Sequence, residues 1–425
     1  MNRRVFLGSL VAGAATLGRR PAVAQAQPTV KLGLIGCGWY GGVVLDAAYK
    51  AGGVELLAAC DVDSERVAAA AKKYGAQQAA PPRTFKHWKD LLDVPGLQAV
   101  VIATPPHWHA LPFIEACRRG LDIYCEKPLA YDVREGRAMV DAAKASGRVV
   151  QVGFQRRQSE AVKQAARYLA EGHAGRVLAV DAQIHYAPKL ADPAPKTPPA
   201  SLDWEQWCGP APLLPYSEQV GHFNWRLEKA YGNGHLVDWG IHWIDAIRTV
   251  LKLGAPTGIQ AAGGLYQLKG RITTPDVLNA TFEFGDLPVT WRHRLVGAPE
   301  YAPETNIGMF FYGERETVFL TDSKYVVIPA GKDVPRRTVD AGNDQQLAHV
   351  SEFLHAVRTR GPVSCTPEDA HRSTASVQLA MVALETGSRL AWDGGTEQVR
   401  DNPRAASLLK RDYRGPWVHP YSGRS

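Results

Sequence analysis

Two short stretches of the sequence hold side chains that could move a proton or stabilise charge on a reacting oxygen. Lys127 lies in the run EKP at 126–128, directly after an apolar segment. A lysine there could hydrogen-bond a substrate oxygen and stabilise a developing alkoxide. Asp238, His242 and Asp245 have the spacing of one face of a helix. Because histidine titrates near neutrality, His242 is a natural acceptor for the proton of an alcohol that loses hydride, with a neighbouring carboxylate to orient the imidazole.

Each of these side chains also has an ordinary explanation. Most lysines in such loops are solvated, and a histidine on a helix surface often pairs with a carboxylate four residues before it. A metal site is a weaker alternative, because this stretch holds one histidine and no other ligands are evident. For Lys127, His242 and Asp238 the residues alone leave both a catalytic and an ordinary role open, and we predict that no metal is bound.

A glycine-rich turn is the first of the elements that must position these residues. Gly36, Gly38 and Gly41 form a G-x-G-x-x-G between a short apolar strand and the start of a helix. In a dinucleotide site the first glycine permits the tight turn, the second lets the backbone approach a pyrophosphate, and the third lets helix and strand pack closely. A second apolar strand ends at Asp61, 20 residues after Gly41, where a carboxylate would hold ribose hydroxyls.

Strands and helices alternate from Thr29 to about Val150, which predicts a doubly wound parallel sheet of the Rossmann type. Ligands bind such sheets outside the carboxyl ends of the strands. The predicted strands are 30–35, 54–60, 98–103, 122–125 and 149–154. We therefore expect these residues, besides the glycines, Asp61 and Lys127, to contact a cofactor: Trp39, Tyr40, Thr104, Pro105, His109 and Glu126.

After residue 150 the pattern becomes that of an α+β domain with a largely antiparallel open sheet. Aromatic residues gather between 202 and 243. Their flat faces suit a sugar ring, although packing in a core or between subunits explains them equally well. We expect a signal at 1–26, a nucleotide-binding domain at 27–150, a substrate and oligomerisation domain at 151–390, and a tail at 391–425. The candidate substrate contacts are Arg156, Tyr231, Trp225 and Asp245.

The first 26 residues predict export. Arg3 and Arg4 precede an apolar run that is too short for a permanent membrane span, and Ala24-Gln25-Ala26 offers a cleavage site. We expect the machinery that exports folded proteins with twin-arginine signals to carry the chain to the periplasm. Cleavage after Ala26 would leave no membrane anchor. The alternative is the arginine-rich N-terminus of a cytoplasmic enzyme.

Charge and cysteine content argue against a nucleic-acid-binding protein and against a disulfide framework. The net charge falls from +7 to +3 without the signal, which holds four arginines and no acidic residue. With no dense basic stripe elsewhere, we expect no nucleic-acid partner. The six cysteines form no C-x-x-C, so we expect most of them to be reduced, which fits folding before export.

Taken together, these motifs resemble those of the Gfo/Idh/MocA oxidoreductase family. The resemblance implies an N-terminal Rossmann domain and a C-terminal α/β domain whose open sheet often forms the interface of a homodimer or homotetramer. It implies hydride transfer between NAD(P) and a sugar or cyclitol. It also implies that Lys127 polarises the reacting oxygen, that His242 is the general acid/base, and that Asp238 orients substrate or imidazole. The matching segments are GCGWYG (36–41), ACDVD (59–63), ATPPHWHA (103–110), EKP (126–128) and DWGIHWID (238–245).

The export signal is similar to that of the family's secreted branch, which includes an NADP-favouring oxidoreductase without the strand-end carboxylate and NAD-dependent glycosidases. Because Asp61 would repel a 2′-phosphate, we predict NAD, with NADP the less favoured cofactor. The leading hypothesis is an exported NAD-dependent oxidoreductase that acts on a sugar, glycoside or cyclitol. The alternatives are a glycoside hydrolase or lyase that oxidises the sugar transiently, and a non-catalytic sugar-binding protein. Since free NAD should be scarce outside the cytoplasm, we expect a tightly held cofactor that is loaded before export.

Overall fold

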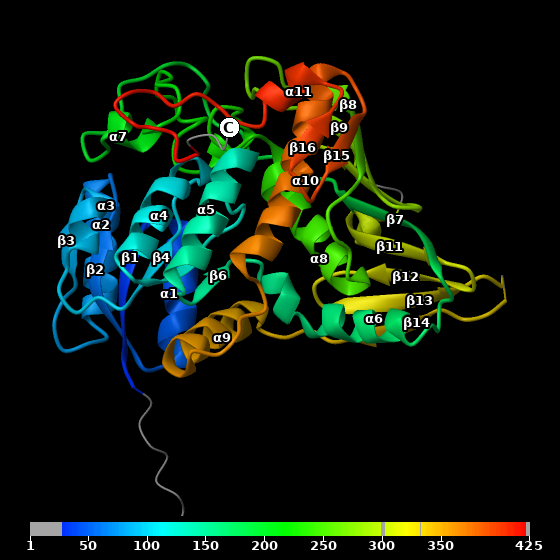
Figure 1. Ribbon diagram of the computed structural model, residues 1–425, viewed down its shortest axis with the longest axis horizontal. Coiled ribbons are helices and arrows are strands. Elements are labelled where there is room, and N and C mark those ends of the chain that lie inside the picture. The colour runs from blue at the N-terminus through cyan, green and yellow to red at the C-terminus, as the bar shows by residue number, and fades with distance from the viewer. Residues whose placement is uncertain (1–27, 299–301, 332, 422–425) are drawn as a thin grey trace, which may run out of the picture.

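The computed structural model describes residues 28–298, 302–331 and 333–421. The predicted export signal therefore lies outside the described residues. Figure 1 shows two sheets side by side, with helices between and around them. None of the helices in the described part of the chain is both long enough and apolar enough to cross a membrane.

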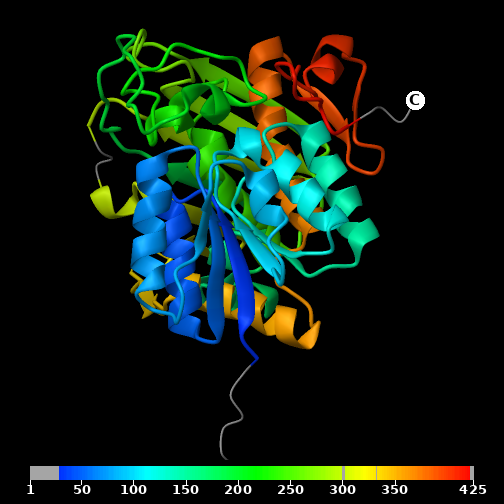
Figure 2. The ribbon, with the colours of Figure 1, turned by 90° about the vertical axis from the view of Figure 1, so that its left-hand side faces the viewer.

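The first sheet is parallel and six-stranded, in the order β3-β2-β1-β4-β5-β6. Figure 2 shows its strands flanked by helices on both sides, which confirms the predicted Rossmann arrangement. The strand β3 was not predicted, because three residues after two prolines give no periodicity. The strands are β1 (Val30–Ile35), β2 (Val54–Cys60), β3 (Arg83–Phe85), β4 (Ala99–Ile102), β5 (Asp122–Cys125) and β6 (Val150–Val152). The helices that follow them in this domain are α1 (Trp39–Ala51), α2 (Ser64–Gly75), α3 (Trp88–Leu92), α4 (Ala110–Arg118) and α5 (Val133–Ser146).

A late helix completes this first domain. The helix α9 (Gln345–Thr359) packs along α1, and its Val350, Phe353 and Leu354 belong to the same apolar cluster as β1. The chain thus returns to the nucleotide-binding domain, so the single predicted boundary at residue 150 was wrong for this segment. Periodicity shows that a helix has an apolar face, but it does not show which domain covers that face.

The second sheet has ten strands in the order β14-β13-β12-β11-β7-β10-β9-β8-β15-β16. Its paired strands are antiparallel except for β7 and β10, as the sequence predicted. The predicted C-terminal tail at 391–425 was wrong in part, because β15 and β16 form a hairpin that extends the sheet edge at β8. The strands are β7 (Val177–Ile184), β8 (Gly258–Gly264), β9 (Val277–Phe284), β10 (Leu287–Arg294), β11 (Ile307–Gly313), β12 (Glu316–Leu320), β13 (Lys324–Pro329), β14 (Arg337–Asp340), β15 (Leu390–Asp393) and β16 (Gln398–Arg400). The helices of this part are α6 (Glu160–Ala170), α7 (Trp204–Cys208), α8 (Ile241–Leu251), α10 (Pro367–Thr386) and α11 (Pro403–Ser407).

The two faces of the large sheet differ in burial. The helices α6, α8 and α10 contact one face, where paired residues such as Phe282, Val289 and Val180 are fully buried. Successive side chains of a strand point to opposite faces of the sheet. The neighbouring residues Thr281 and Thr290 therefore point to the other face, where both are only partly buried. The large sheet is therefore open on one face across these strands.

Candidate active site

The glycine turn has the shape of a pyrophosphate cradle. Gly36 has φ +95°, and a Cβ there would lie 2.7 Å from the carbonyl carbon of Ala103. A Cβ on Gly41 would lie 2.1 Å from the Gly36 oxygen, so helix and strand meet at this point. By contrast, a Cβ on Gly38 would meet nothing closer than Arg66 at 3.8 Å. A glycine at 38 thus leaves space in front of the turn, as a bound phosphate requires.

The N-terminus of α1 faces this space without a competing group. Gly38 is the N-cap, no side chain caps the helix, and its first turn holds no acidic residue. The unpaired N–H groups of the first turn therefore favour an anion. Trp39, the first residue of the helix, is 63% exposed.

Asp61 ends β2 beside the glycine turn. Its Oδ2 accepts a hydrogen bond from the Cys37 N–H (2.7 Å), and its Oδ1 accepts one from the Asp63 N–H (3.0 Å). Burial raises the pKa of Asp61, and these two hydrogen bonds oppose the shift. Because each carboxylate oxygen can accept a second hydrogen bond, Asp61 fits the two hydroxyls of a ribose.

A cavity of about 430 Å³ lies against the cradle and the strand ends. Its size is within the usual range of cofactor sites. Beyond the Rossmann loops, the wall includes residues from two distant segments. These are Gln206, Trp207, His222, Phe223, Trp225 and Arg226 from the second domain, and Pro416 and Trp417 near the C-terminus. Figure 2 shows both segments, green and red, at one end of the Rossmann sheet.

The loop after β4 forms another part of this wall. Thr104 and Pro105 line the cavity, and the Thr104 hydroxyl is buried without a protein partner among the described residues. The ring nitrogens of His109 lie 2.8 Å from the Pro128 carbonyl oxygen and 2.7 Å from that of Thr104. His109 therefore joins the loops after β4 and β5 and does not itself line the cavity.

Lys127 and Asp238 meet at the end of β5. The Lys127 Nζ donates to Asp238 Oδ1 (2.9 Å) and to the Asp238 carbonyl oxygen (2.7 Å). The second carboxylate oxygen of Asp238 is 3.1 Å from Nε of Arg226. Burial alone would raise the pKa of Asp238, but Lys127 and Arg226 outweigh burial and hold it below its usual value. Asp238 is thus a carboxylate between two cations, and Arg226 connects this pair to the cavity.

A wide helical turn explains why Asp238 faces Lys127. Residues Leu236–Gly240 form a π-helix, labelled η4, and the α-helix α8 begins at Ile241. The sequence predicted one continuous α-helical face for Asp238, His242 and Asp245, and this prediction was wrong. A π turn has more residues per turn than an α turn, so the direction of Asp238 shifts relative to α8, and π turns are frequent at functional sites.

His242 is buried, and its Nδ1 has no hydrogen-bond partner among the described residues. Its ring lies beside Phe154 (6.3 Å between centroids) and Trp239 (6.1 Å). Burial lowers the pKa of His242 well below its usual value, and the charges of Arg156 and Lys127 add to the shift. The imidazole is therefore neutral, and a substrate hydroxyl could hydrogen-bond to it.

Glu126 and Tyr40 lie on the Rossmann side of this site. Glu126 is 4% exposed, its Oε2 accepts from the Lys127 N–H (3.2 Å), and its Oε1 has no protein partner among the described residues. Burial raises the pKa of Glu126 to about 7. The Tyr40 hydroxyl accepts from Gln155 Nε2 (2.7 Å) and donates to Gln346 Oε1 (3.0 Å). A buried carboxyl oxygen without a protein partner is expected where a cofactor supplies the missing hydrogen bond.

Three of the four predicted substrate contacts have structural partners instead. Asp245 is 1% exposed and binds Arg157 through both oxygens (2.6 and 2.8 Å). Tyr231 is fully buried, and its hydroxyl donates to the Pro212 carbonyl oxygen (3.0 Å). We therefore assign Asp245 and Tyr231 to packing. Their charge and aromaticity suggested ligand binding, but their partners are too distant in the chain for sequence to reveal.

Arg156 and Trp225 are closer to the site. Two nitrogens of Arg156 bind Asp322 (2.7 and 2.9 Å), and its guanidinium lies over the Trp243 ring at 4.8 Å. This positions Arg156 near His242 without leaving it free for a ligand. Trp225 lines the cavity, as the sequence predicted for a ligand contact.

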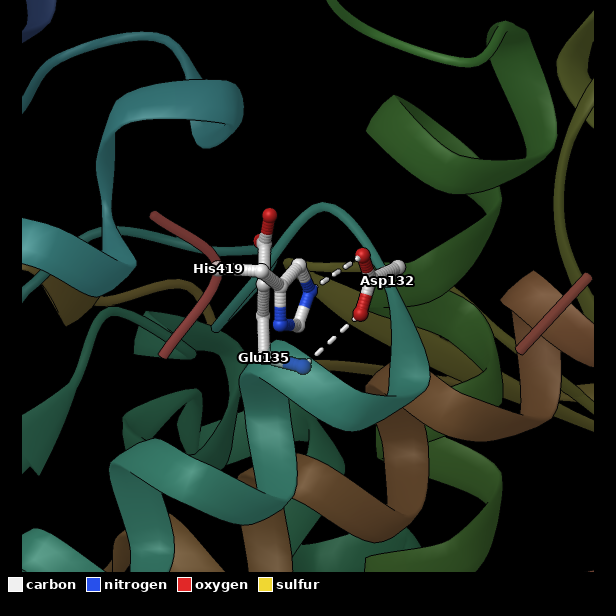
Figure 3. A group of neighbouring side chains, drawn as sticks. All are labelled: Asp132, Glu135 and His419. Atoms are coloured by element: carbon white, nitrogen blue, oxygen red, sulfur yellow. Dashed lines mark hydrogen bonds and ion pairs between the residues drawn. The ribbon is translucent and has the colours of Figure 1, made fainter. Parts of the chain in front are cut away.

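A cluster away from this site has metal-like spacing. Ligand atoms of Asp132, Glu135 and His419 lie within 4.8 Å of one another (Figure 3). However, His419 Nε2 lies 3.1 Å from Asp132, and Arg411 lies 2.8 Å from Glu135. A buried arginine would repel a metal cation, so we interpret the cluster as an ion-pair network that holds the C-terminal segment on α5.

In the second-domain segment 222–226 the sequence identified only Trp225 as part of the site, and it did not identify Trp417. Segment 222–226 and Trp417 both adjoin irregular parts of the chain. In such parts no periodicity indicates which side chains face the cavity. The crowding of aromatic residues between 202 and 243 was the available signal. However, most of these rings pack with one another around Trp204, Trp207 and Tyr231.

Comparison with known proteins identifies the family. The model of the oxidoreductase family NAD-binding Rossmann fold, Gfo/Idh/MocA, matches residues 30–154. The model of the C-terminal alpha/beta domain of the same family matches residues 182–261 and 329–419. The chain therefore belongs to the Gfo/Idh/MocA oxidoreductase family.

Several characterised relatives act on sugars or cyclitols. The levoglucosan dehydrogenase of Pseudarthrobacter phenanthrenivorans is 33% identical over 44% of this chain and 40% of its own length. The inositol 2-dehydrogenase of Salmonella typhimurium is 31% identical over 40% of this chain and 50% of its own length. The match thus spans half or less of these relatives. An uncharacterised oxidoreductase of Rhizobium meliloti is 26% identical over 88% of this chain and 94% of its own length.

Solved structures share the whole fold. Levoglucosan dehydrogenase in complex with NADH and levoglucosan has a TM-score of 0.67 at 22% identity, covering 85% of this chain and 98% of that chain. Aldose-aldose oxidoreductase from Caulobacter crescentus, complexed with glycerol, has a TM-score of 0.67 at 18% identity, covering 85% and 99%.

Proposed function

We propose that this protein is an NAD-dependent oxidoreductase that transfers hydride to or from a sugar, glycoside or cyclitol. The observation that carries the proposal is the proximity of Lys127 to His242, a buried histidine with an unpartnered Nδ1, together with Arg226, which links the Lys127–Asp238 pair to a nucleotide-sized cavity. The relatives named for levoglucosan and inositol oxidation support this substrate class.

The roles follow from the chemistry of each side chain. NAD bound in the cavity would supply the hydride acceptor. Lys127 would hydrogen-bond the reacting oxygen through an N–H that Asp238 does not use, since an ammonium group has three donors. His242 would accept the hydroxyl proton during oxidation and return it during reduction. Asp238 would hold Lys127 in place, rather than orient the imidazole, because its carboxylate oxygens bind Lys127 and Arg226.

NAD rather than NADP is supported by the charges at the ribose end. Asp61 would repel a 2′-phosphate. Two of the cations that line this part of the cavity are already paired, Arg66 with Asp63 (3.5 Å) and Lys86 with Asp203. A 2′-phosphate that bound Arg66 or Lys86 would therefore have to displace an existing carboxylate partner.

We further propose that the protein is exported to the periplasm by the twin-arginine route and carries its cofactor with it. The N-terminal sequence supports export. The cavity wall contributed by segments 222–226 and 416–417 supports retention, because these segments add wall to the cavity beyond the Rossmann loops.

A direct test uses the protein purified from the periplasm. Gel filtration followed by acid release and mass spectrometry identifies any bound nucleotide, and NAD is expected. Levoglucosan, inositols, aldoses and aryl glycosides are then added without free NAD. A rise in absorbance at the NADH wavelength supports oxidation with net redox, whereas release of phenol without accumulated NADH supports the hydrolase alternative. A protein that binds neither NAD nor NADP contradicts the proposal.

A further inference from the structure

Arg226 joins the segment that covers the cavity to the catalytic pair. It lies in the short 3₁₀ helix Asn224–Leu227, far from the Rossmann sheet in sequence. Its Nε lies 3.1 Å from Asp238 Oδ2, and its Nη1 donates to the Phe223 carbonyl oxygen (2.7 Å). Its guanidinium is 4.7 Å from the Phe223 ring and 4.4 Å from the Trp225 ring. Two aromatic faces and two polar contacts thus fix the direction of this group.

The same segment contacts the nucleotide-binding loops at its other end. His222 Nε2 lies 3.1 Å from Asp63 Oδ2, just after the ribose-binding position. The Phe223 ring lies 6.1 Å from the ring of Trp39 at the start of α1. Residues 222–226 therefore extend along the cavity from the ribose end to the Lys127–Asp238 pair.

We propose that Arg226 is a positioning residue for this reaction, which orients Asp238 and through it Lys127 while segment 222–226 covers the cofactor cavity. The inference rests on the proposed function. With one carboxylate oxygen held by Arg226, the other accepts a hydrogen bond from Lys127, so the position of the ammonium group depends on Arg226. Arg226 acts through Asp238 and is not assigned a contact with the reacting atoms.

This role has an electrostatic signature. Arg226 and Lys127 together keep Asp238 ionised in a buried position, so loss of either charge raises the pKa of Asp238. The acid limb of the pH profile then moves to higher pH. The groups that face or influence Asp238 are Lys127 and Glu126 after β5, Arg226, His235 in the preceding turn, Tyr186 after β7, and Tyr40 on α1.

The test compares Arg226→Gln with Arg226→Lys in the NAD-loaded enzyme, using the sugar that the wild type oxidises. For Arg226→Gln we expect kcat to fall roughly 10- to 100-fold, the equivalent of one hydrogen bond to a charged group. We expect KM for the sugar to change less than kcat, and the acid limb of kcat to move up in pH. Arg226→Lys keeps the charge, so it should restore the position of the acid limb but only part of kcat.

Arg389→Gln is the matched control, because Arg389 also binds a carboxylate, Glu283, but on the surface away from the site. Its kcat and pH profile should equal those of the wild type. The inference is overturned if Arg226→Gln keeps the wild-type acid limb, or if Arg226→Lys behaves like Arg226→Gln at every pH. If Arg226→Gln does not fold, the acid limb of the pH profile and the kcat of Arg226→Lys are compared with those of the wild type instead. A wild-type kcat in Arg226→Lys then overturns the inference. A wild type without turnover overturns the proposed function as well, whereas an active wild type with unaltered variants overturns this inference alone.

Discussion

The chemistry of His242 depends on its surroundings more than on its identity. A buried imidazole next to Arg156 and Lys127 resists protonation, because a third positive charge would be added in a site of low polarity. It is therefore ready to accept a proton at pH values at which a solvated histidine would be charged. Substrate oxidation should keep its rate well below the ordinary histidine pKa of about 6.5.

We predict that His242→Asn lowers kcat for oxidation by roughly 10²- to 10⁴-fold, the usual contribution of a general base. Bound NAD should be retained, because His242 does not line the cavity. Steady-state kinetics and nucleotide content measure the two effects. His173→Asn, at a side chain that is 52% exposed and pairs with Glu171, is the control and should leave both unchanged. Equal kcat values for His242→Asn and the wild type would exclude a proton-transfer role.

Glu126 should make the stability of the nucleotide-free protein depend on pH. Its folded-state pKa of about 7 lies above the usual carboxyl value, since burial disfavours the charge. The folded state thus holds a proton that the unfolded state has lost, and stability should fall as pH rises from about 4.3 to 7. Glu126→Gln should flatten this part of the urea-unfolding profile, whereas Glu65→Gln at an exposed position should not. An unchanged slope for Glu126→Gln would refute the assignment.

Sequence reasoning located correctly the residues that follow a local pattern. The glycines, Asp61 and Lys127 all follow strands, so the parallel sheet brings them to one edge. It failed for Asp245, whose partner Arg157 is 88 residues away, and for Arg226, whose irregular segment has no period. Pairing between distant segments is decided by tertiary packing, which the local pattern does not contain.

At the scale of elements, the C-terminal segment is fastened by a buried charge. Arg411 is in contact with Glu135 on α5, donates to the His107 carbonyl oxygen (2.9 Å), and lies 4.2 Å from the Tyr131 ring. These contacts attach the end of the chain to the Rossmann domain, a few residues before Trp417 enters the cavity wall. The segment that the sequence predicted to be an irregular tail is thus part of the nucleotide site.

We predict that Arg411→Ala destabilises the protein by about 3–5 kcal/mol, because it leaves the buried Glu135 carboxylate without its cation. Urea unfolding at pH 7 measures this loss. The loss should shrink at low pH, where Glu135 becomes protonated. Bound nucleotide should also dissociate faster, because Trp417 loses its support. The matched control is Arg400→Ala, in an exposed pair with Asp393, for which about 0–1 kcal/mol is expected. A similar small effect for Arg411→Ala would contradict the anchoring role.

At the scale of the whole molecule, one face of the large sheet has no covering helix among the described residues across β7, β10 and β11. Phe310 on β11 lies 4.6 Å from Phe319 on β12 and 6.2 Å from Tyr312, between ring centroids. Phe310 pairs with Asp181 on β7, and Asp181 pairs with Thr290 on β10. These side chains therefore lie in rows on the face opposite the helices. A cluster of aromatic rings there suits contact with a second copy of the chain better than contact with water.

We predict that the protein is a dimer or tetramer and that Phe310→Glu shifts it toward the monomer, because a carboxylate in this aromatic cluster would be buried without a partner in the assembly. Light scattering coupled to gel filtration measures the mass against the 46.3 kDa of the full chain. Lys144→Glu, on the exposed side of α5, is the control and should keep the wild-type mass. The fold should survive in Phe310→Glu, since Phe310 is only partly buried in one subunit, and circular dichroism checks this. A monomeric wild type, or a Phe310→Glu variant of unchanged mass, would show that the open face is not the interface.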